Sequence, residues 1–472
     1  MIEHRIGSRA VLSRKDLFWG YAAQVLNIGL GLIMLPVIVR YMSPEEVGLW
    51  FVFITLAGLA QLLELGFQPT LSRNVAYVYA GAQRLSKFGI EENDNGPLNL
   101  GLLADLVMAS QWIYRWIAIA ATVVLLVGGT LYIMSLLPKG QNEIAILAGW
   151  YSYVVGNVIN FYYGYLNSLL QGRGDVTEAN KVVIASRSIQ VLLSVIMVVA
   201  GFGLLGLGIS SLLSTIVSRI IAKRYVFSPH HPEMNMLATD AAGRRRLVKI
   251  IWHNASRFGV VMVGVFLIWR ANVLIASSYL GLAEAASYGL AIHIFLLLNT
   301  IATVPFNLAL PKLNSMRSQG QNDRVYQAFS SLLVTTLLIY LALAMIVMFY
   351  GDSMLNLIGS TTKLPSEFIL LGMVVVFFLE INHGTCANFI TTGNQIPFVK
   401  AAIVTGVFIV FGSILIAPII GMAGLVISQG FFQIVYNNWK WPQEVGRIFH
   451  ITYVKILIDG LVFFKKRWLA MS

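Results

Sequence analysis

Charged residues are scarce in this chain: Asp, Glu, Lys and Arg make up 11% of its 472 residues. A soluble domain carries about 25%. Hydrophobic residues account for 57%, and the mean hydropathy is +0.74. Most of the surface must therefore face something other than water. The composition excludes an ordinary soluble protein and makes the lipid bilayer the expected surroundings.

Cysteine and processing signals are also in short supply. Cys386 is the only cysteine and lies inside an apolar stretch, so no intrachain disulfide can form and nothing indicates an oxidised extracellular domain. A cleavable signal is not expected, because Arg5, Arg9 and Arg14 lead straight into an apolar stretch of full spanning length. The phosphate-binding motif Gly-x-x-x-x-Gly-Lys-Ser/Thr is absent, so we expect neither nucleotide hydrolysis nor a cofactor.

Long apolar stretches, in contrast, recur from Leu17 to Trp439. Each is long enough to cross a ~30 Å hydrocarbon core as an α-helix, the only open structure that satisfies its own backbone in lipid. The sequence predicts an all-α transmembrane bundle with twelve spans in two six-helix lobes. The predicted spans are residues 17–39, 47–67, 112–136, 144–170, 182–201, 204–224, 251–276, 284–310, 329–350, 366–390, 397–417 and 422–440.

The basic residues lie mostly on one side of these spans. The formal net charge is +12, which in a soluble protein would suggest a nucleic-acid partner. Here both termini and one set of connections hold 25 Lys and Arg, and the opposite set holds only Arg40, Lys139 and Lys363. Because cytoplasmic connections carry the excess of positive charge, both termini are predicted to be cytoplasmic, and no nucleic-acid partner is expected.

The sequence also predicts where the chain divides. A long basic segment separates two sets of six spans, and residues 41–46 resemble residues 279–284, as in transporters built from parallel repeats. Lys455 and Asp459 interrupt the last apolar stretch, which favours an interfacial helix over a further span. The predicted parts are an N-terminal lobe at 1–222, a cytoplasmic linker at 223–250, a C-terminal lobe at 251–440 and a cytoplasmic amphipathic tail at 441–472.

Arginines inside spans are costly and are therefore functional candidates. Arg187 and Arg257 lie away from the span ends, and we predict that they face a water-filled cavity, with a buried structural ion pair as the alternative. Arg270 lies toward the outer end of span seven. Arg115 opens span three and Arg219 closes span six, where a long side chain can extend to the interface. The candidate cationic cavity consists of Arg187, Arg257, Arg270 and Arg115.

Two spans carry polar side chains along one helical face. In span four, Asn157, Asn160 and Asn167 fall on one seam, and in span five Gln190 follows Arg187 by one turn. A polar seam either holds helices together or lines a path. Both interpretations stay open for these residues.

A carboxylate also lies inside a span. Glu380 is near the middle of span ten, and His383 follows it by one turn. Glu-x-x-His would suggest a metal if it were repeated, but no second copy occurs, so no metal site is expected. The pair is a candidate for ion coupling, since a carboxylate in a dry setting and an imidazole can both exchange protons. The alternative is that Glu380 neutralises an arginine, and Glu64 is predicted to be a surface partner at the end of span two.

The most distinctive motif lies at residues 35–74. It reads Leu-Pro-Val-Ile-Val-Arg-Tyr-Met-Ser-Pro-Glu-Glu-Val-Gly-Leu-Trp from Leu35, followed by Leu-Glu-Leu-Gly-Phe from Leu63 and Leu-Ser-Arg-Asn from Leu71. This segment resembles the opening of polysaccharide-repeat (Wzx-type) flippases, which belong to the multidrug/oligosaccharidyl-lipid/polysaccharide exporter superfamily.

The resemblance implies two lobes around a cationic cavity and alternating access that moves undecaprenyl-pyrophosphate-linked sugar units across a bacterial inner membrane. It implies a role in O-antigen-like surface polysaccharide, with a polysaccharide polymerase and a chain-length regulator as further partners. Guanidinium groups bind phosphate in a two-pronged fashion, so the candidate arginines would suit a pyrophosphate.

Other classes of membrane protein remain as alternatives. A cation-coupled exporter of drugs or other small molecules would share the same superfamily, and a non-catalytic structural membrane protein would leave the arginines without a role. The predicted outer connections are too short to hold a catalytic site. We therefore expect a transporter rather than an enzyme such as a membrane glycosyltransferase.

Overall fold

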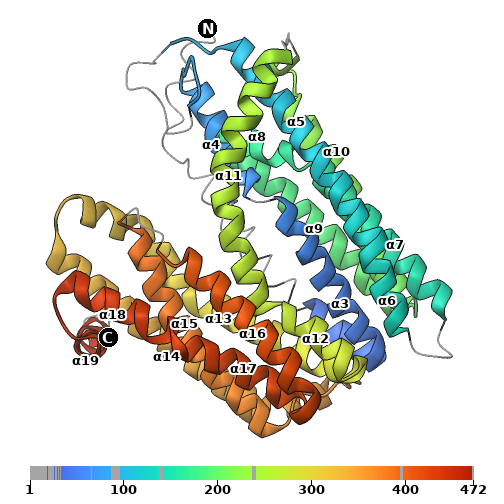
Figure 1. Cartoon of the computed structure of the whole chain (residues 1–472), viewed down its shortest axis with the longest axis vertical. Helices are drawn as coiled ribbons and strands as arrows, with labels where there is room; N and C mark the ends of the chain where they lie inside the picture. Colours follow the sequence, from blue (N-terminus) through green and yellow to red (C-terminus); the bar gives the residue numbers. More distant parts are fainter. Residues whose placement is uncertain are drawn as a thin grey trace. The chain divides into compact units, whose positions relative to one another are not determined.

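The computed structural model describes residues 33–64, 66–86, 96–137, 142–235, 241–393 and 397–469, together with 19, 26, 29 and 31. The chain packs as two compact units, Met1–Val263 and Gly264–Ser472 (Figure 1). The boundary between them falls inside helix α11, Ala241–Trp269. The predicted lobes at 1–222 and 251–440, and the linker between them, stay predictions.

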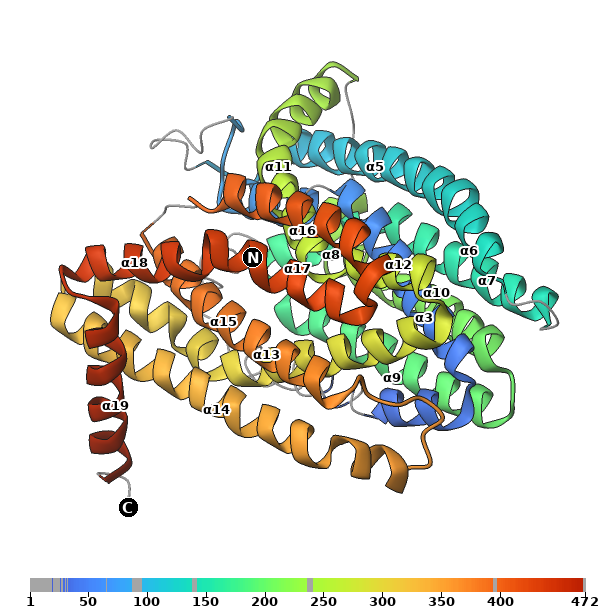
Figure 2. The ribbon, with the colours of Figure 1, turned by 60° about the horizontal axis from the view of Figure 1, so that its bottom comes forward.

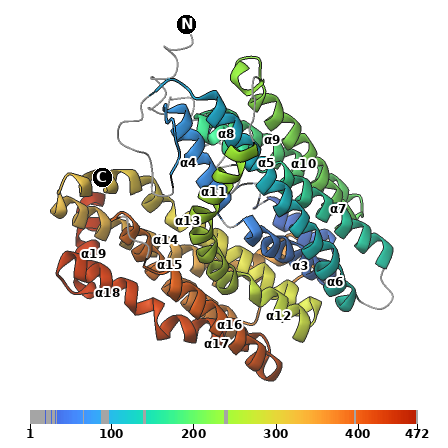
Figure 3. The ribbon, with the colours of Figure 1, turned by 45° about the horizontal axis from the view of Figure 1, so that its top comes forward.

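Most helices of the first unit, drawn in Figure 3, are separated by a few residues along the chain, and longer connections occur at 80–99 and 227–240. Ser43 starts the first of these helices with a reciprocal cap: its hydroxyl accepts from the Glu46 amide, and the Glu46 carboxylate accepts from the Ser43 amide. The elements are α3 (Pro44–Gln61), η1 (Leu62–Glu64), α4 (Phe67–Tyr79), α5 (Leu100–Val123), the π-helical η2 (Val124–Gly129), α6 (Thr130–Leu136), α7 (Glu143–Tyr162), α8 (Tyr165–Arg173), α9 (Val176–Val199), α10 (Gly203–Val226) and η3 (Pro232–Asn235).

The second unit contains longer helices, several of which run side by side (Figure 2). Two of these helices approach each other closely at a glycine: a Cβ on Gly424 would lie 2.8 Å from the backbone nitrogen of Ala417 in the neighbouring helix. The elements are α12 (Ala271–Tyr279), α13 (Leu282–Ser318), α14 (Asn322–Leu357), α15 (Glu367–Thr391), α16 (Val399–Ile420), α17 (Met422–Val435), α18 (Asn437–Phe449) and α19 (Tyr453–Leu469).

Ten helices among the described residues are long and apolar enough to cross a membrane. They match ten of the twelve predicted spans, which confirms a multi-pass α-helical membrane protein. The narrow division between the fifth and sixth spans is correct, because Gly201 and Gly203 turn the chain with φ of 86° and 45°. Most of the first predicted span, 17–39, lies outside the described residues, although 33–41 are helical.

Two of the predicted spans are broken rather than continuous. Span four ends at Tyr162 and resumes as α8 at Tyr165. Span twelve is split at Tyr436, whose φ of −138° and ψ of −61° are not helical, so α17 ends one residue before it and α18 begins one residue after it. The sequence does not reveal either break, because the residues before and after each break have a similar composition.

The close packing of α7 against α10 leads to a prediction about stability. A Cβ on Gly208 would collide with the backbone carbonyl of Gly149, and backbone cannot move aside cheaply. Gly208→Ala should therefore lower the free energy of unfolding by about 1–3 kcal/mol, measured by thermal or denaturant unfolding of the purified protein. Gly128→Ala is the matched control, since a Cβ there meets nothing within 4 Å; equal melting temperatures for the two variants would contradict the prediction.

Candidate functional site

Glu380 and His383 lie together in the interior of the second unit. They are three residues apart in α15, so they lie on neighbouring parts of one helical face. Glu380 is 6% exposed and His383 is 8% exposed. The imidazole Nε2 is 3.9 Å from the Glu380 Oε1 atom. The two predicted ion-coupling residues are thus a buried pair that faces each other.

A chain of hydrogen bonds holds the Glu380 carboxylate. Gln433 donates its Nε2 to the Glu380 Oε2 at 2.9 Å, and Asn437 donates its Nδ2 to the Gln433 Oε1 at 2.7 Å. Asn437 also donates to the Thr405 hydroxyl at 3.1 Å and accepts from the Trp441 indole at 3.0 Å. These hydrogen bonds join the end of α17 to the beginning of α18 across the break at Tyr436.

His383 is held in one orientation by its other ring nitrogen. The Nδ1 atom lies 3.1 Å from the Leu379 carbonyl oxygen and 2.8 Å from the Asn438 Oδ1. Both partners are acceptors, so Nδ1 carries the hydrogen and Nε2 is left facing Glu380 with its lone pair. An imidazole in this tautomer can take up a proton at Nε2 beside the carboxylate.

The pair opens onto a cavity of about 340 Å³ within the second unit. The wall combines apolar groups with polar ones that the sequence analysis did not select. Asn299 and Thr303 come from α13, Asn388 from α15 and Asn437 from α18. Their spacing in the sequence could have identified them: Asn299 and Thr303, like Gln433 and Asn437, are polar residues one helical turn apart in apolar spans. The remaining wall is Val265, Ile268, Trp269, Ile381, Gly384, Thr385, Ala387, Phe398, Ala402 and Trp441.

The alternative role for Glu380, neutralising an arginine, has no support in the described residues. Its carboxylate instead contacts the Gln433 amide and the His383 imidazole. Arg257 lies in α11, and its side chain is outside the described part of the chain. Arg270 is half-buried, directly precedes α12, and lies within electrostatic range of His293.

A second polar cluster lies inside the first unit, around Arg219. This side chain is 9% exposed. Its guanidinium donates to the Asn160 side-chain oxygen, to the Asn167 Oδ1 at 3.2 Å and to the Tyr163 carbonyl at 3.4 Å. These contacts join α10 to the break between α7 and α8. The polar seam of span four therefore binds another helix here, while Asn157 donates to the Tyr153 carbonyl of its own helix at 2.9 Å.

One prediction about this cluster was wrong. Arg219 does not extend to the interface, because the Asn160 and Asn167 oxygens hold it inside the unit. Glu64, which was predicted to be a surface partner, is half-buried; it accepts from the Tyr114 hydroxyl at 2.7 Å and interacts electrostatically with Arg219. Sequence position suggested helix ends, but the break at Tyr163 brings these residues together.

Two other predicted arginines of the first unit, Arg187 and Arg115, are exposed. Arg187 donates to Gln190 at 3.0 Å along the surface of α9. Arg115 lies between Trp112 and Trp116, which are 42% and 53% exposed. It lies inside α5 rather than at the opening of a span, since that helix begins at Leu100. Neither arginine belongs to the Arg219 cluster.

Comparisons with known proteins give the fold. No family model matches the sequence, and no curated protein matches it. Among solved structures, an inward-facing multidrug resistance MATE family transporter of the MOP superfamily has a TM-score of 0.62 and 14% identity over 89% of this chain and 95% of its own. An outward-facing one has a TM-score of 0.58 and 14% identity over 96% of both chains.

A third structure, a mutant of the Vibrio cholerae MATE transporter VcmN, has a TM-score of 0.58 and 13% identity over 93% of this chain and 98% of its own. At these identities the likeness establishes the fold and no more, because one fold hosts many functions. The chain therefore has the all-α architecture of MATE transporters. This agrees with the predicted superfamily at the level of architecture.

The Arg219 cluster predicts a large difference between two arginine substitutions. Arg219→Ala removes the partner of Glu64, Asn160 and Asn167, and breaking a buried charge network costs about 3–5 kcal/mol. Arg187→Ala removes an exposed side chain and should change stability by no more than about 0.5 kcal/mol. Denaturant or thermal unfolding of both purified variants, compared with the unsubstituted protein, measures these changes in stability. A fully stable Arg219→Ala protein would show that the cluster contributes little.

Proposed function

We propose that this protein is a secondary transporter that works by alternating access, and that Glu380 carries the coupling ion, a proton. The carrying observation is the buried carboxylate itself. It faces a cavity, it is held by the amide of Gln433, and His383 is its only ionisable neighbour among the described residues. Intramembrane carboxylates in such surroundings mark ion pathways in pumps and transporters.

The protonation state of Glu380 would change the energetics of the cavity. The ionised carboxylate needs hydrogen-bond donors, and Gln433 supplies one at 2.9 Å. A protonated carboxyl is neutral and can donate a hydrogen bond itself. Two states that differ by a buried charge favour different packing of the surrounding helices, so proton uptake can shift a conformational equilibrium.

We propose small organic molecules as the substrate class. Two of the solved structures with the same fold are those of multidrug resistance transporters. The cavity of about 340 Å³ has the size of a small-ligand site. Aromatic side chains of Trp269, Phe398 and Trp441 supply apolar wall, and amides supply orientation.

Flipping of a lipid-linked glycan is the second candidate. The observation in its favour is the motif at residues 35–74, which resembles polysaccharide-repeat flippases. In that case the pyrophosphate would be held by Arg187, Arg257, Arg270 and Arg115. The protein would lie in a bacterial inner membrane, with a polysaccharide polymerase and a chain-length regulator as partners. A guanidinium suits a pyrophosphate because its planar fork of donors matches the geometry of phosphate oxygens.

Glu380→Gln tests the coupling role. The substitution keeps the shape and an acceptor for Gln433 but removes the titratable group. In proteoliposomes with an imposed pH gradient, gradient-driven uptake of a fluorescent cationic dye should fall at least about tenfold, as expected when an essential proton-transfer group is removed. Glu367→Gln, at the exposed start of the same helix, is the matched control and should transport normally.

The outcome against this proposal is specific. Undiminished gradient-driven transport by Glu380→Gln, at equal protein level, would exclude the carboxylate as the coupling site.

Gene deletion separates the two substrate classes: accumulation of single polyprenyl-linked repeat units with loss of surface glycan, measured by mass spectrometry, would favour the flippase. Normal glycan with increased drug sensitivity would favour the exporter.

A further inference from the structure

Helix α19 runs crosswise to its neighbours in the second unit. It follows α18 after a sharp corner, where His450 adopts a left-handed φ of 56°. A Cβ on Gly446 would lie 2.7 Å from the Ile451 carbonyl oxygen, so the corner needs a glycine at its inside. Figure 2 shows α19 lying across the direction of α14 and α18, and Figure 1 shows it nearly end-on while α14 runs lengthwise. If α14 crosses the membrane, α19 lies in the membrane plane.

The inner face of α19 packs on the first turns of α14. Ile456 is fully buried, and Gly460 lies against the Ser330 carbonyl. The Tyr326 hydroxyl donates to the Asp459 carboxylate at 2.6 Å. These α14 residues lie at the beginning of the predicted ninth span, 329–350. If α14 crosses the membrane at the predicted span, this contact places α19 near the point where α14 enters the hydrocarbon.

The outer face of α19 is apolar and uncovered. Val454, Ile458, Leu461 and Val462 are 64%, 54%, 52% and 47% exposed, and their spacing places them on one side of the helix. We call these four residues the α19 stripe. Lys455 and Lys465 are exposed at its edge and at its far end. An apolar stripe bordered by lysines is the pattern of helices that lie in a membrane interface.

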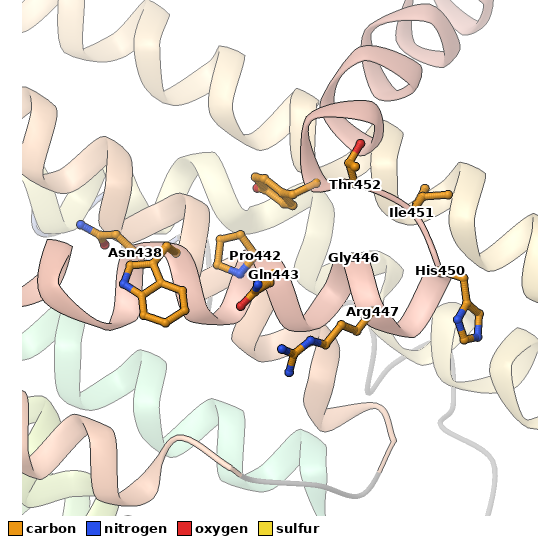
Figure 4. A pocket seen from close by; sticks show the side chains of 10 residues that line it. Asn438, Pro442, Gln443, Gly446, Arg447, His450, Ile451 and Thr452 are labelled. Atoms are coloured by element: carbon orange, nitrogen blue, oxygen red, sulfur yellow. The ribbon is translucent and has the colours of Figure 1, made fainter.

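The corner between α18 and α19 extends this surface. It borders an open groove of about 1000 Å³ that is lined by ten residues between Asn438 and Tyr453 (Figure 4). Arg447 and His450 contribute basic groups at its edge, and Thr452 lies at the start of α19. Glu444 partly offsets the charge of Arg447, at 3.2 Å. The surface is basic where a helix in the membrane plane would meet lipid headgroups.

We propose that α19 is an interfacial helix that binds anionic phospholipid. The α19 stripe inserts at the boundary between headgroups and acyl chains, and Lys455 and Lys465 contact the phosphates. Charge complementarity favours anionic lipid over a second copy of this basic protein, whose net charge is +12. The crosswise direction and the contact with the first turns of α14 exclude a spanning role for these residues.

The experiment places an environment-sensitive fluorophore on Ile458→Cys in the full-length protein in nanodiscs. Cys386 is buried, so the unsubstituted protein gives the background labelling. Brominated phosphatidylglycerol and brominated phosphatidylcholine serve as quenching probes. We expect quenching by both, with half-maximal quenching at a several-fold lower mole fraction of the anionic lipid. Gln319→Cys, in the exposed turn before α14, should not be quenched.

Charge removal tests the anionic preference. Lys455→Ala should raise the half-quenching fraction of phosphatidylglycerol about fivefold, the factor that corresponds to about 1 kcal/mol per lysine near an anionic surface. Lys363→Ala, an exposed lysine distant in sequence from α19, should change nothing. A fluorophore at 458 that no lipid quenches overturns the proposal, and so does equal quenching by the two lipids or an equal effect of the two lysine substitutions.

Discussion

A hydrocarbon core offers no partner to a polar group, and this constraint governs most of the structure. Every backbone amide inside the membrane must bond within its own helix, which leaves helices as the only open spanning element. The same constraint acts on side chains. Arg219 can lie inside the first unit because Asn160, Asn167 and the Tyr163 carbonyl accept its hydrogen bonds, and Glu380 can lie inside the second because Gln433 donates to it.

The broken helices are where this constraint and the polar clusters meet. A break frees backbone carbonyls that must find other donors. At the end of α7, the Tyr163 carbonyl accepts from the Leu166 amide at 3.1 Å and from Arg219 at 3.4 Å. Near Tyr436, the side chains of Gln433, Asn437 and Trp441 bond to one another across the point where the helix stops. Both candidate clusters thus lie beside an interruption, as binding sites in transporters commonly do.

The sequence was sufficient for the fold class and for ten of the spans, because hydropathy over twenty residues is a strong signal. It was sufficient for Glu380 and His383 as a pair, since helical spacing alone brings them together. It failed for Arg219, whose position near the end of a predicted span suggested a side chain that extends to the interface. Its hydrogen-bond partners come from α7 and α8, and Glu64 beside it bonds to α5, so only tertiary packing shows that these three helices meet α10 there.

Helices α13 and α14, with 37 and 36 residues, are much longer than a bilayer requires. At 1.5 Å per residue α14 extends about 54 Å, whereas the hydrocarbon is about 30 Å thick. A tilt of ~10° about the C-terminal end of this helix moves its N-terminal end by about 9 Å. Because α19 is fixed to the first turns of α14, the resistance of the membrane surface to that displacement becomes part of the mechanical load on any rearrangement of the second unit.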